Sequence, residues 1–332
     1  MDYAHVGILV LSLFLFCYII IGSIDYGAGF FTLHAKITHQ DKRINHLIAR
    51  YLNPVWEVTN VFFVFFFVGI VGFFPDTAKY MGTVLLVPAS ISLILLSFRG
   101  GFYAFENYGP DTKLPWLALY GIAGLFIPAS LSVAFTVSEG GYIHEYAHHI
   151  DLDWTELFLS PFSWAVVFLA VLTVLYISAG FLTYYAAKAE DWKAYKLVRY
   201  WFIFWGPPMI AMSLFVLLTL RIQNHTHFMT AVQDYWWMFA LSLVCFVIAM
   251  LLVLFKVAHG FAFIMVILQV FFAFLGYGLS KIPYILYPYV SIEHGAANGS
   301  MALALIIAFI AGFLLLLPSL LFFMRLSIFY TG

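Results

Sequence analysis

The chain consists of long apolar runs separated by short polar stretches. A helix crosses the core of a bilayer with about 20 apolar residues, and windows of that length recur along the whole sequence. They lie at 6–33, 53–74, 79–103, 115–138, 160–187, 199–221, 237–255, 259–279 and 302–324. The pattern therefore predicts an all-α polytopic membrane protein with nine transmembrane helices.

The composition supports this prediction. Of the 332 residues, 64% are hydrophobic and 9% are charged, and the net charge is −1. These values exclude a soluble domain, and they leave no basic surface for nucleic acid. The N-terminus has no basic segment and no small-residue cleavage site, so we expect the first helix to be retained as a span. Cys17 and Cys245 lie within apolar runs, so we expect neither a disulfide nor a metal–thiolate site.

Positive charges are divided unevenly between alternate connections. Three of the fifteen lie on one side of the predicted membrane, namely Lys79, Arg221 and Lys281. The others lie on the opposite side: Lys36, Lys42, Arg43, Arg50, Arg99, Lys113, Lys188, Lys193, Lys196, Arg199, Lys256 and Arg325. The positive-inside rule then places the N-terminus outside, the C-terminus in the cytoplasm, and the loops 34–52, 104–114 and 188–198 inside. The loop 139–159, which has five acidic residues and no lysine or arginine, fits an outside position.

A weak internal repeat underlies this layout. The sequence "AGFFTLHAKI" at 28–37 is echoed by "AGFLTYYAAK" at 179–188, an offset of 151 residues that spans four predicted helices. An even number of helices returns the chain to the same side, so the halves would be parallel repeats. We therefore predict a first four-helix bundle at 1–138, a second at 139–279, and an outside loop with a peripheral ninth helix at 280–332. Chance recurrence of small and aromatic residues is the alternative.

Asp25 is an acidic residue within the first apolar window, where a carboxylate is costly and is therefore a candidate for function. It shares one arc of the helix with Tyr18, Gly22, Gly29 and Thr32. Because small residues allow a neighbouring helix to approach closely, we expect Asp25 to face protein or a wet crevice. It either moves protons or only joins two helices through a hydrogen bond.

The second predicted helix opens with "LNPVWEVTNVFF", in which Asn53, Glu57 and Asn60 share a face beside Trp56. This helix is antiparallel to the first, so Asp25 and Glu57 belong to the same leaflet. Two carboxylates in a low dielectric have raised pKa values, which suits proton uptake and release near neutral pH. The alternative for Glu57 is an acid favoured by the dipole at the helix N-terminus.

Arg99, in "LLSFRGGFYAFEN", lies at the cytoplasmic end of the third predicted helix. It is able to pair with either acid. The alternative is an arginine that extends to lipid phosphates and anchors the topology.

The histidines all fall at predicted helix ends or in loops. Because haem in a membrane bundle needs an axial ligand well inside a helix, we expect no haem ligation by histidine in this chain. "HEYAHH" at 144–149 satisfies H-E-x-x-H, but it lies in a short loop without an apolar helix or a third ligand, so a solvated cluster is favoured over a metal site.

These residues resemble the second subunit of cytochrome bd-type quinol oxidases. The resemblance rests on "IDYGAG" in the first helix, "PVWEVTNVFF" in the second, Phe98 and Arg99 in the third, and a closing segment after "SIEHGAANGS". It implies a haem-free, non-catalytic subunit in the membrane of a bacterial cell. The implied partner is a haem-bearing subunit I with haem b and haem d. The resemblance further implies that the whole oxidase is electrogenic, takes electrons from quinol, and has room for small single-span subunits.

The resemblance also implies roles for the acids. Asp25 and Glu57 would conduct protons from the cytoplasm towards the oxygen-reducing site in the partner, whereas Arg99 matches the motif without a firm role. The family often has Asp followed by Gly-Asn where this chain has Glu57 followed by Val58 and Thr59. Side-chain reach therefore differs at this position. A proton-coupled secondary transporter and a purely structural scaffold are the alternative functions.

Overall fold

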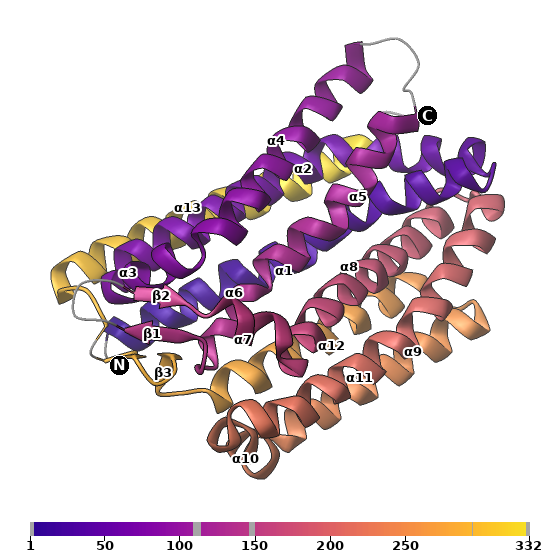
Figure 1. Cartoon of the computed structure of the whole chain (residues 1–332). Coiled ribbons are helices and arrows are strands. Elements are labelled where there is room, and N and C mark those ends of the chain that lie inside the picture. The colour runs from indigo at the N-terminus through magenta and orange to yellow at the C-terminus, as the bar shows by residue number, and fades with distance from the viewer. Residues whose placement is uncertain (1–2, 109–113, 146–149, 294, 330–332) are drawn as a thin grey trace.

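The computed structural model describes residues 3–108, 114–145, 150–293 and 295–329. Within the helices, it leaves out the side chains of residues 41–43, 45–46, 49–57, 103–108, 317, 320–321 and 323–329. The described chain is almost entirely helical (Figure 1). Its helices are α1 (Tyr3–Ile37), α2 (Asp41–Phe73), α3 (Pro75–Val84), α4 (Leu86–Tyr108), α5 (Leu114–Leu131), α6 (Val133–Ser138), α7 (Trp154–Leu159), α8 (Pro161–Lys188), α9 (Trp192–Gln223), α10 (His225–Gln233), α11 (Trp236–Phe255), α12 (His259–Ser280) and α13 (Gly299–Phe329).

Seven segments of the described chain are long and apolar enough to cross a membrane: α1, the α5–α6 pair, α8, α9, α11, α12 and the first part of α13. The α3–α4 pair adds an eighth candidate if it counts as one span, and residues 58–73 of α2 form a shorter apolar helix. The chain is therefore a multi-pass membrane protein, as predicted. The count of nine spans stays a prediction.

The third predicted span is not one straight helix. It breaks between Val84 and Leu86, and the two parts are bent by 78°. Pro88 gives the physical reason, because it has no N–H for the carbonyl of Val84 and its ring would clash with the preceding turn. Two predicted loops are also shorter than expected: α1 and α2 leave only residues 38–40 between them, and α8 and α9 leave only 189–191.

Element boundaries recur along the chain at nearly the offset of the sequence repeat. α2 begins at Asp41 and α9 at Trp192, 151 positions apart, and the short helices α3 and α10 begin 150 positions apart. The two helices that carry the repeated sequence also end alike. The N–H of Gln40 donates to the carbonyl of Ala35, and the N–H of Asp191 donates to that of Ala186. These shared endings support the internal repeat, while the two-bundle arrangement stays a prediction.

The helices α1 and α8 occupy the centre of the molecule and pack against each other. α1 also packs against α2 and α5, and α8 packs against α9 and α12 in the same way. Burial is most complete in the second half of α1, where residues 22–29 are all buried. α13 packs on α2 and α1. A charged residue in the second half of α1 is therefore enclosed by protein.

Two short hairpins cover the end of the molecule where α1 begins (Figure 1). β1 (Ile143–Glu145) pairs antiparallel with β2 (Ile150–Leu152), and β3 (Tyr284–Leu286) pairs antiparallel with β4 (Val290–Ser291). Their buried apolar side chains, together with Val84, Val137, Tyr142 and Leu157, form a small core of their own. The described parts of the predicted loop, residues 139–145 and 150–159, therefore form a folded cap.

Candidate functional site

The predicted site residues Asp25 and Arg99 meet in the interior of the first half. Arg99 is 0% exposed and Asp25 is 1% exposed, and Nη2 of Arg99 lies 2.9 Å from Oδ1 of Asp25. This ion pair confirms that Arg99 pairs with an acid. The alternative, an arginine that extends to lipid phosphates, is wrong because the side chain is enclosed by α1, α4 and α5.

The guanidinium of Arg99 has several other partners. Its Nη2 also donates to the carbonyl of Asp25 at 3.1 Å, and its Nη1 donates to the carbonyl of Tyr120 at 3.0 Å. The same group lies over the ring of Tyr120 at 4.2 Å and near that of Tyr26 at 5.2 Å. Burying a charge is tolerated only with such partners. We call Asp25, Tyr26, Arg99 and Tyr120 the Asp25 cluster.

Glycines make room for this cluster. A Cβ added to Gly29 would lie 2.9 Å from Nη1 of Arg99, and one added to Gly124 would lie 2.4 Å from the carbonyl oxygen of Tyr26. The prediction that Asp25 faces protein is confirmed, and Gly22 and Gly29 are buried with it. The sequence did not single out Gly124 or Tyr120, because their role depends on how α5 packs against α1.

The polar face predicted on α2 is described only in part. Asn60 is half-buried, while the side chains of Asn53, Trp56 and Glu57 lie outside the described residues. A contact further along α2 still shows which residues of α1 and α2 lie at the same height in the membrane. A Cβ at Gly22 would lie 3.4 Å from Cγ2 of Thr59, so α1 and α2 meet there. Because the two helices are antiparallel, Asp25, three residues further along α1, lies near the level of residue 56 on α2.

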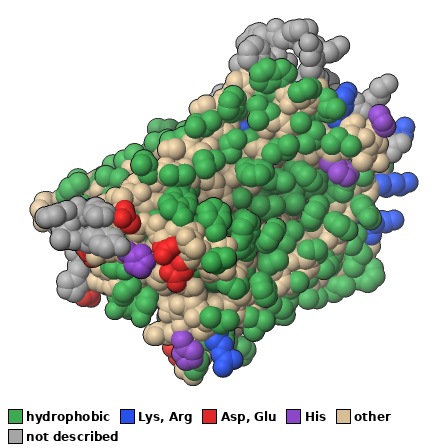
Figure 2. All heavy atoms as spheres, viewed as in Figure 1, with side chains coloured by type: hydrophobic (Ala, Val, Ile, Leu, Met, Phe, Trp, Pro, Cys, Tyr) green, Lys and Arg blue, Asp and Glu red, His purple; other side chains and the backbone are tan. Residues whose placement is uncertain are grey.

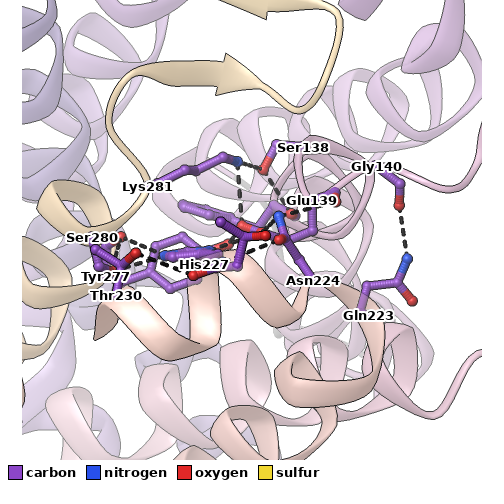
Figure 3. A network of polar contacts seen from close by, with 12 residues as sticks. Ser138, Glu139, Gly140, Gln223, Asn224, His227, Thr230, Tyr277, Ser280 and Lys281 are labelled. Atoms are coloured by element: carbon purple, nitrogen blue, oxygen red, sulfur yellow. Dashed lines mark hydrogen bonds and ion pairs between the residues drawn. The ribbon is translucent and has the colours of Figure 1, made fainter. Parts of the chain in front are cut away.

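A second buried polar cluster was missed by the sequence analysis (Figure 3). Its centre is Glu139, which follows α6 and is 0% exposed. Nδ1 of His227 lies 2.8 Å from Oε2 of Glu139, Nζ of Lys281 lies 3.3 Å from Oε1, and the hydroxyl of Tyr277 donates to Oε1. We call Ser138, Glu139, Asn224, His227, Tyr277, Ser280 and Lys281 the Glu139 cluster.

Each element contributes to the Glu139 cluster through its end. Asn224 caps α10 by accepting from the N–H of His227, and its Nδ2 donates to Oε2 of Glu139 at 3.2 Å. Lys281 follows the last residue of α12 and donates to Ser138. The cluster therefore joins the ends of α6, α10 and α12 at the hairpin end of the molecule.

The charge state of Glu139 follows from these contacts. Burial raises its pKa, but attraction to Lys281 and the bonds from His227 and Tyr277 outweigh burial and lower the pKa from 4.5 to about 2. Burial lowers the pKa of Lys281, and Glu139 opposes that change. Glu139 is therefore an ionised acceptor surrounded by donors at neutral pH.

Glu139, His227 and Ser280 form a hydrogen-bonded row, with 2.8 Å between Nε2 of His227 and Oγ of Ser280. The order resembles that of a hydrolytic triad. Ser280, however, is 3% exposed and donates to the carbonyl of Tyr277 at 3.0 Å. The row therefore serves to hold helices together.

The described start of the H-E-x-x-H match, His144 and Glu145, lies in a strand and not in a helix. His144 instead lies with its Nε2 3.4 Å from Oδ2 of Asp153, and Glu156 is close to both. His148 and His149 lie outside the described residues. His144 and Glu156 are exposed, and Asp153 and Glu156 supply the further ligand atoms that the sequence did not show, all within 4.8 Å of one another.

Comparisons with known proteins give one consistent family. The family described as cytochrome bd terminal oxidase subunit II matches residues 3–327. A relative from Bacillus subtilis (strain 168), named as a cytochrome bd menaquinol oxidase subunit II, is 31% identical over 333 residues that cover 97% of this chain and 95% of the relative. A chain in the structure of bd oxidase from Geobacillus thermodenitrificans is 50% identical, with a TM-score of 0.86 and full coverage of both chains.

Proposed function

The chain belongs to the cytochrome bd terminal oxidase subunit II family, and from this premise we propose that it supports a haem-bearing subunit I and carries protons towards it. The oxidoreductase complex uses quinol as electron donor. The relative named as a menaquinol oxidase favours menaquinol as this donor. In this proposal the chain itself binds no haem. The secondary-transporter alternative is set aside because the family is that of an oxidase.

The buried Asp25–Arg99 pair is the observation that carries the proton route. Asp25 lies near the level of residue 56 on α2, which supports an approach by way of Glu57. Beyond Asp25, the hydroxyls of Tyr26 and Tyr18 lie 2.8 Å apart. Eight residues, roughly 12 Å of helix, separate these tyrosines along α1, so their side chains point toward each other and their hydroxyls meet between the two positions. The route would start at the end of α1 where the basic loops gather.

Arg99 would act as a fixed counter-charge on this route. For Asp25 to take up a proton, its carboxylate has to leave the guanidinium. Arg99 keeps two backbone acceptors, the carbonyls of Asp25 and Tyr120, when the carboxylate moves away. The arginine can therefore hold its place while the side chain of Asp25 changes its partner.

The test uses Asp25→Asn and Glu57→Ala in the whole complex, with Asp25→Glu as the matched control that keeps a carboxylate. We expect quinol-dependent oxygen consumption per haem to fall by about 10² or more in the first two variants, as for the loss of a proton-transfer group. The haem spectrum stays intact. Asp25→Glu should retain a large part of the activity.

Two outcomes would decide against the proton route. Full turnover per haem in both Asp25→Asn and Glu57→Ala would exclude it. A fall in the yield or melting temperature of the complex, with turnover per haem unchanged, would assign the acids to the structural scaffold alternative.

A further inference from the structure

A surface cavity of about 390 Å³ lies beside the turn between α1 and α2. Its walls are Gln40 from that turn and Lys193, Lys196, Leu197 and Tyr200 from the first three turns of α9. It belongs to the end of the molecule where lysine and arginine side chains gather (Figure 2). It is separate from both buried clusters.

The cavity has a net positive charge. Lys193 and Lys196 are three residues apart, so they lie on the same side of α9, and both are exposed. Within the described ranges, neither has an ion-pair partner. The neighbouring carboxylate of Asp191 caps α9 by accepting from the N–H groups of Lys193 and Ala194. The lysines therefore offer two ammonium groups to an anion from outside the chain.

After Lys196, towards its C-terminus, α9 exposes apolar side chains. Tyr200 is 62% exposed and Phe204 is 51% exposed, and their rings stack at 6.2 Å. Exposed aromatic side chains at the end of a membrane helix are typical of the interface between headgroups and hydrocarbon. A ligand of this site would thus meet cations at one end and an apolar helix face at the other.

We propose that this cavity binds the headgroup of an anionic phospholipid. Its phosphate lies between Lys193 and Lys196, the Gln40 amide reaches the polar headgroup region, and an acyl chain lies along Tyr200 and Phe204. Basic pockets at the cytoplasmic end of membrane helices commonly recognise anionic lipids. A free phosphate would use only the lysines and leave the aromatic face uncovered. The proposal requires that the chain lies in a membrane, and it does not depend on the proton route.

The test uses the purified oxidase complex in nanodiscs of phosphatidylcholine, with or without phosphatidylglycerol. Native mass spectrometry counts the phosphatidylglycerol retained by the wild type and by Lys193→Gln/Lys196→Gln. We expect roughly 30-fold weaker retention in the double variant, since each lysine near the surface contributes about 1 kcal/mol. The haem spectrum and turnover confirm that the complex is folded.

Lys188→Gln is the matched control. This lysine lies at the same end, where its Nζ lies 3.4 Å from the hydroxyl of Tyr184, and it is not part of the cavity wall. Its loss should leave lipid retention unchanged. Equal retention in the wild type and the double variant would overturn the proposal, and so would an equal loss in Lys188→Gln. Competition by inorganic phosphate as strong as that by the lipid would also overturn it, because the apolar face would then contribute nothing.

Discussion

The carboxylate of Glu139 is buried away from water, and four donor side chains take the place of water around it. His227, Lys281, Tyr277 and Asn224 all reach its two oxygens. A carboxylate has about four acceptor positions, so its capacity is filled. Removing the charge would leave Lys281, whose side chain is 10% exposed, without its charged partner, which is costly in so enclosed a place.

We expect Glu139→Gln to destabilise the complex by about 3–5 kcal/mol at neutral pH, as when one partner of a buried pair is lost. The folded pKa of Glu139 is about 2 and its ordinary value is 4.5. A depressed pKa stabilises the folded state above the ordinary value, and this stabilisation is lost as the pH falls from 4.5 towards 2. The difference in melting temperature between wild type and variant should therefore be constant near neutral pH and shrink below about pH 4.5.

Thermal unfolding of the solubilised complex over this pH range measures the difference. Glu156→Gln is the control, because it removes an exposed acid of the same cap and should change stability by about 0.5 kcal/mol or less. A Glu139→Gln effect that is independent of pH down to the lowest value tested would contradict the assigned charge.

At the scale of elements, α1 and α8 meet through residues that are separated by the offset of the predicted internal repeat. Gly27 and Ser178 are 151 positions apart, and a Cβ at Gly27 would lie 2.3 Å from Cβ of Ser178. Oγ of Ser178 donates to the carbonyl of Ile24 at 3.3 Å. Contact between equivalent positions is what a two-fold axis produces. The pair needs one glycine because the two backbones approach closely.

This contact predicts a compensating exchange. Gly27→Ser should destabilise the complex by about 1–3 kcal/mol, because it places two side chains in the space of one. Ser178→Gly should cost about 1 kcal/mol, the usual penalty of glycine in a helix. The double variant should recover most of the loss caused by Gly27→Ser. Melting temperatures of the four proteins form a double-mutant cycle, and strictly additive effects would exclude the shared contact.

Charge is distributed unevenly over the whole molecule. Basic side chains gather at the end with the α1–α2 and α8–α9 turns, whereas acidic side chains gather near the hairpins (Figure 2). Arg99 and Lys281 were counted on opposite sides, and both are neutralised by buried acids. The difference in charge between the two ends therefore depends on the exposed residues that remain. By the positive-inside rule, this difference predicts that the lysine-rich end is cytoplasmic.

Labelling with a membrane-impermeant maleimide tests this orientation. In a background with Cys17→Ala and Cys245→Ala, we expect Glu156→Cys to react in intact cells from which the outer wall has been removed. Lys188→Cys should react only after the membrane is opened. The reverse pattern would place the N-terminus inside and would also reverse the direction of the proposed proton route.

The apolar windows determined much of the fold, because burial of apolar surface depends on the number and spacing of residues and hardly on their partners. They gave the membrane class and most helix positions, and helical spacing placed Gly22, Asp25 and Gly29 on one side of α1. They did not predict the break between Val84 and Leu86 or the short connections. An average of hydropathy over a window does not register the N–H that a proline lacks. It also does not register that a helix continues past the apolar core of the bilayer.

Only the tertiary structure decided the partners of the buried charges. Arg99 lies 74 positions from Asp25, and Lys281 lies 142 positions from Glu139. A hydrogen bond requires its atoms to lie about 3 Å apart, and no local pattern fixes that distance between helices so far apart in sequence. The sequence by itself thus determined that Asp25 must be turned from lipid. The packing of α5 against both α1 and α4 decided that Arg99 receives it.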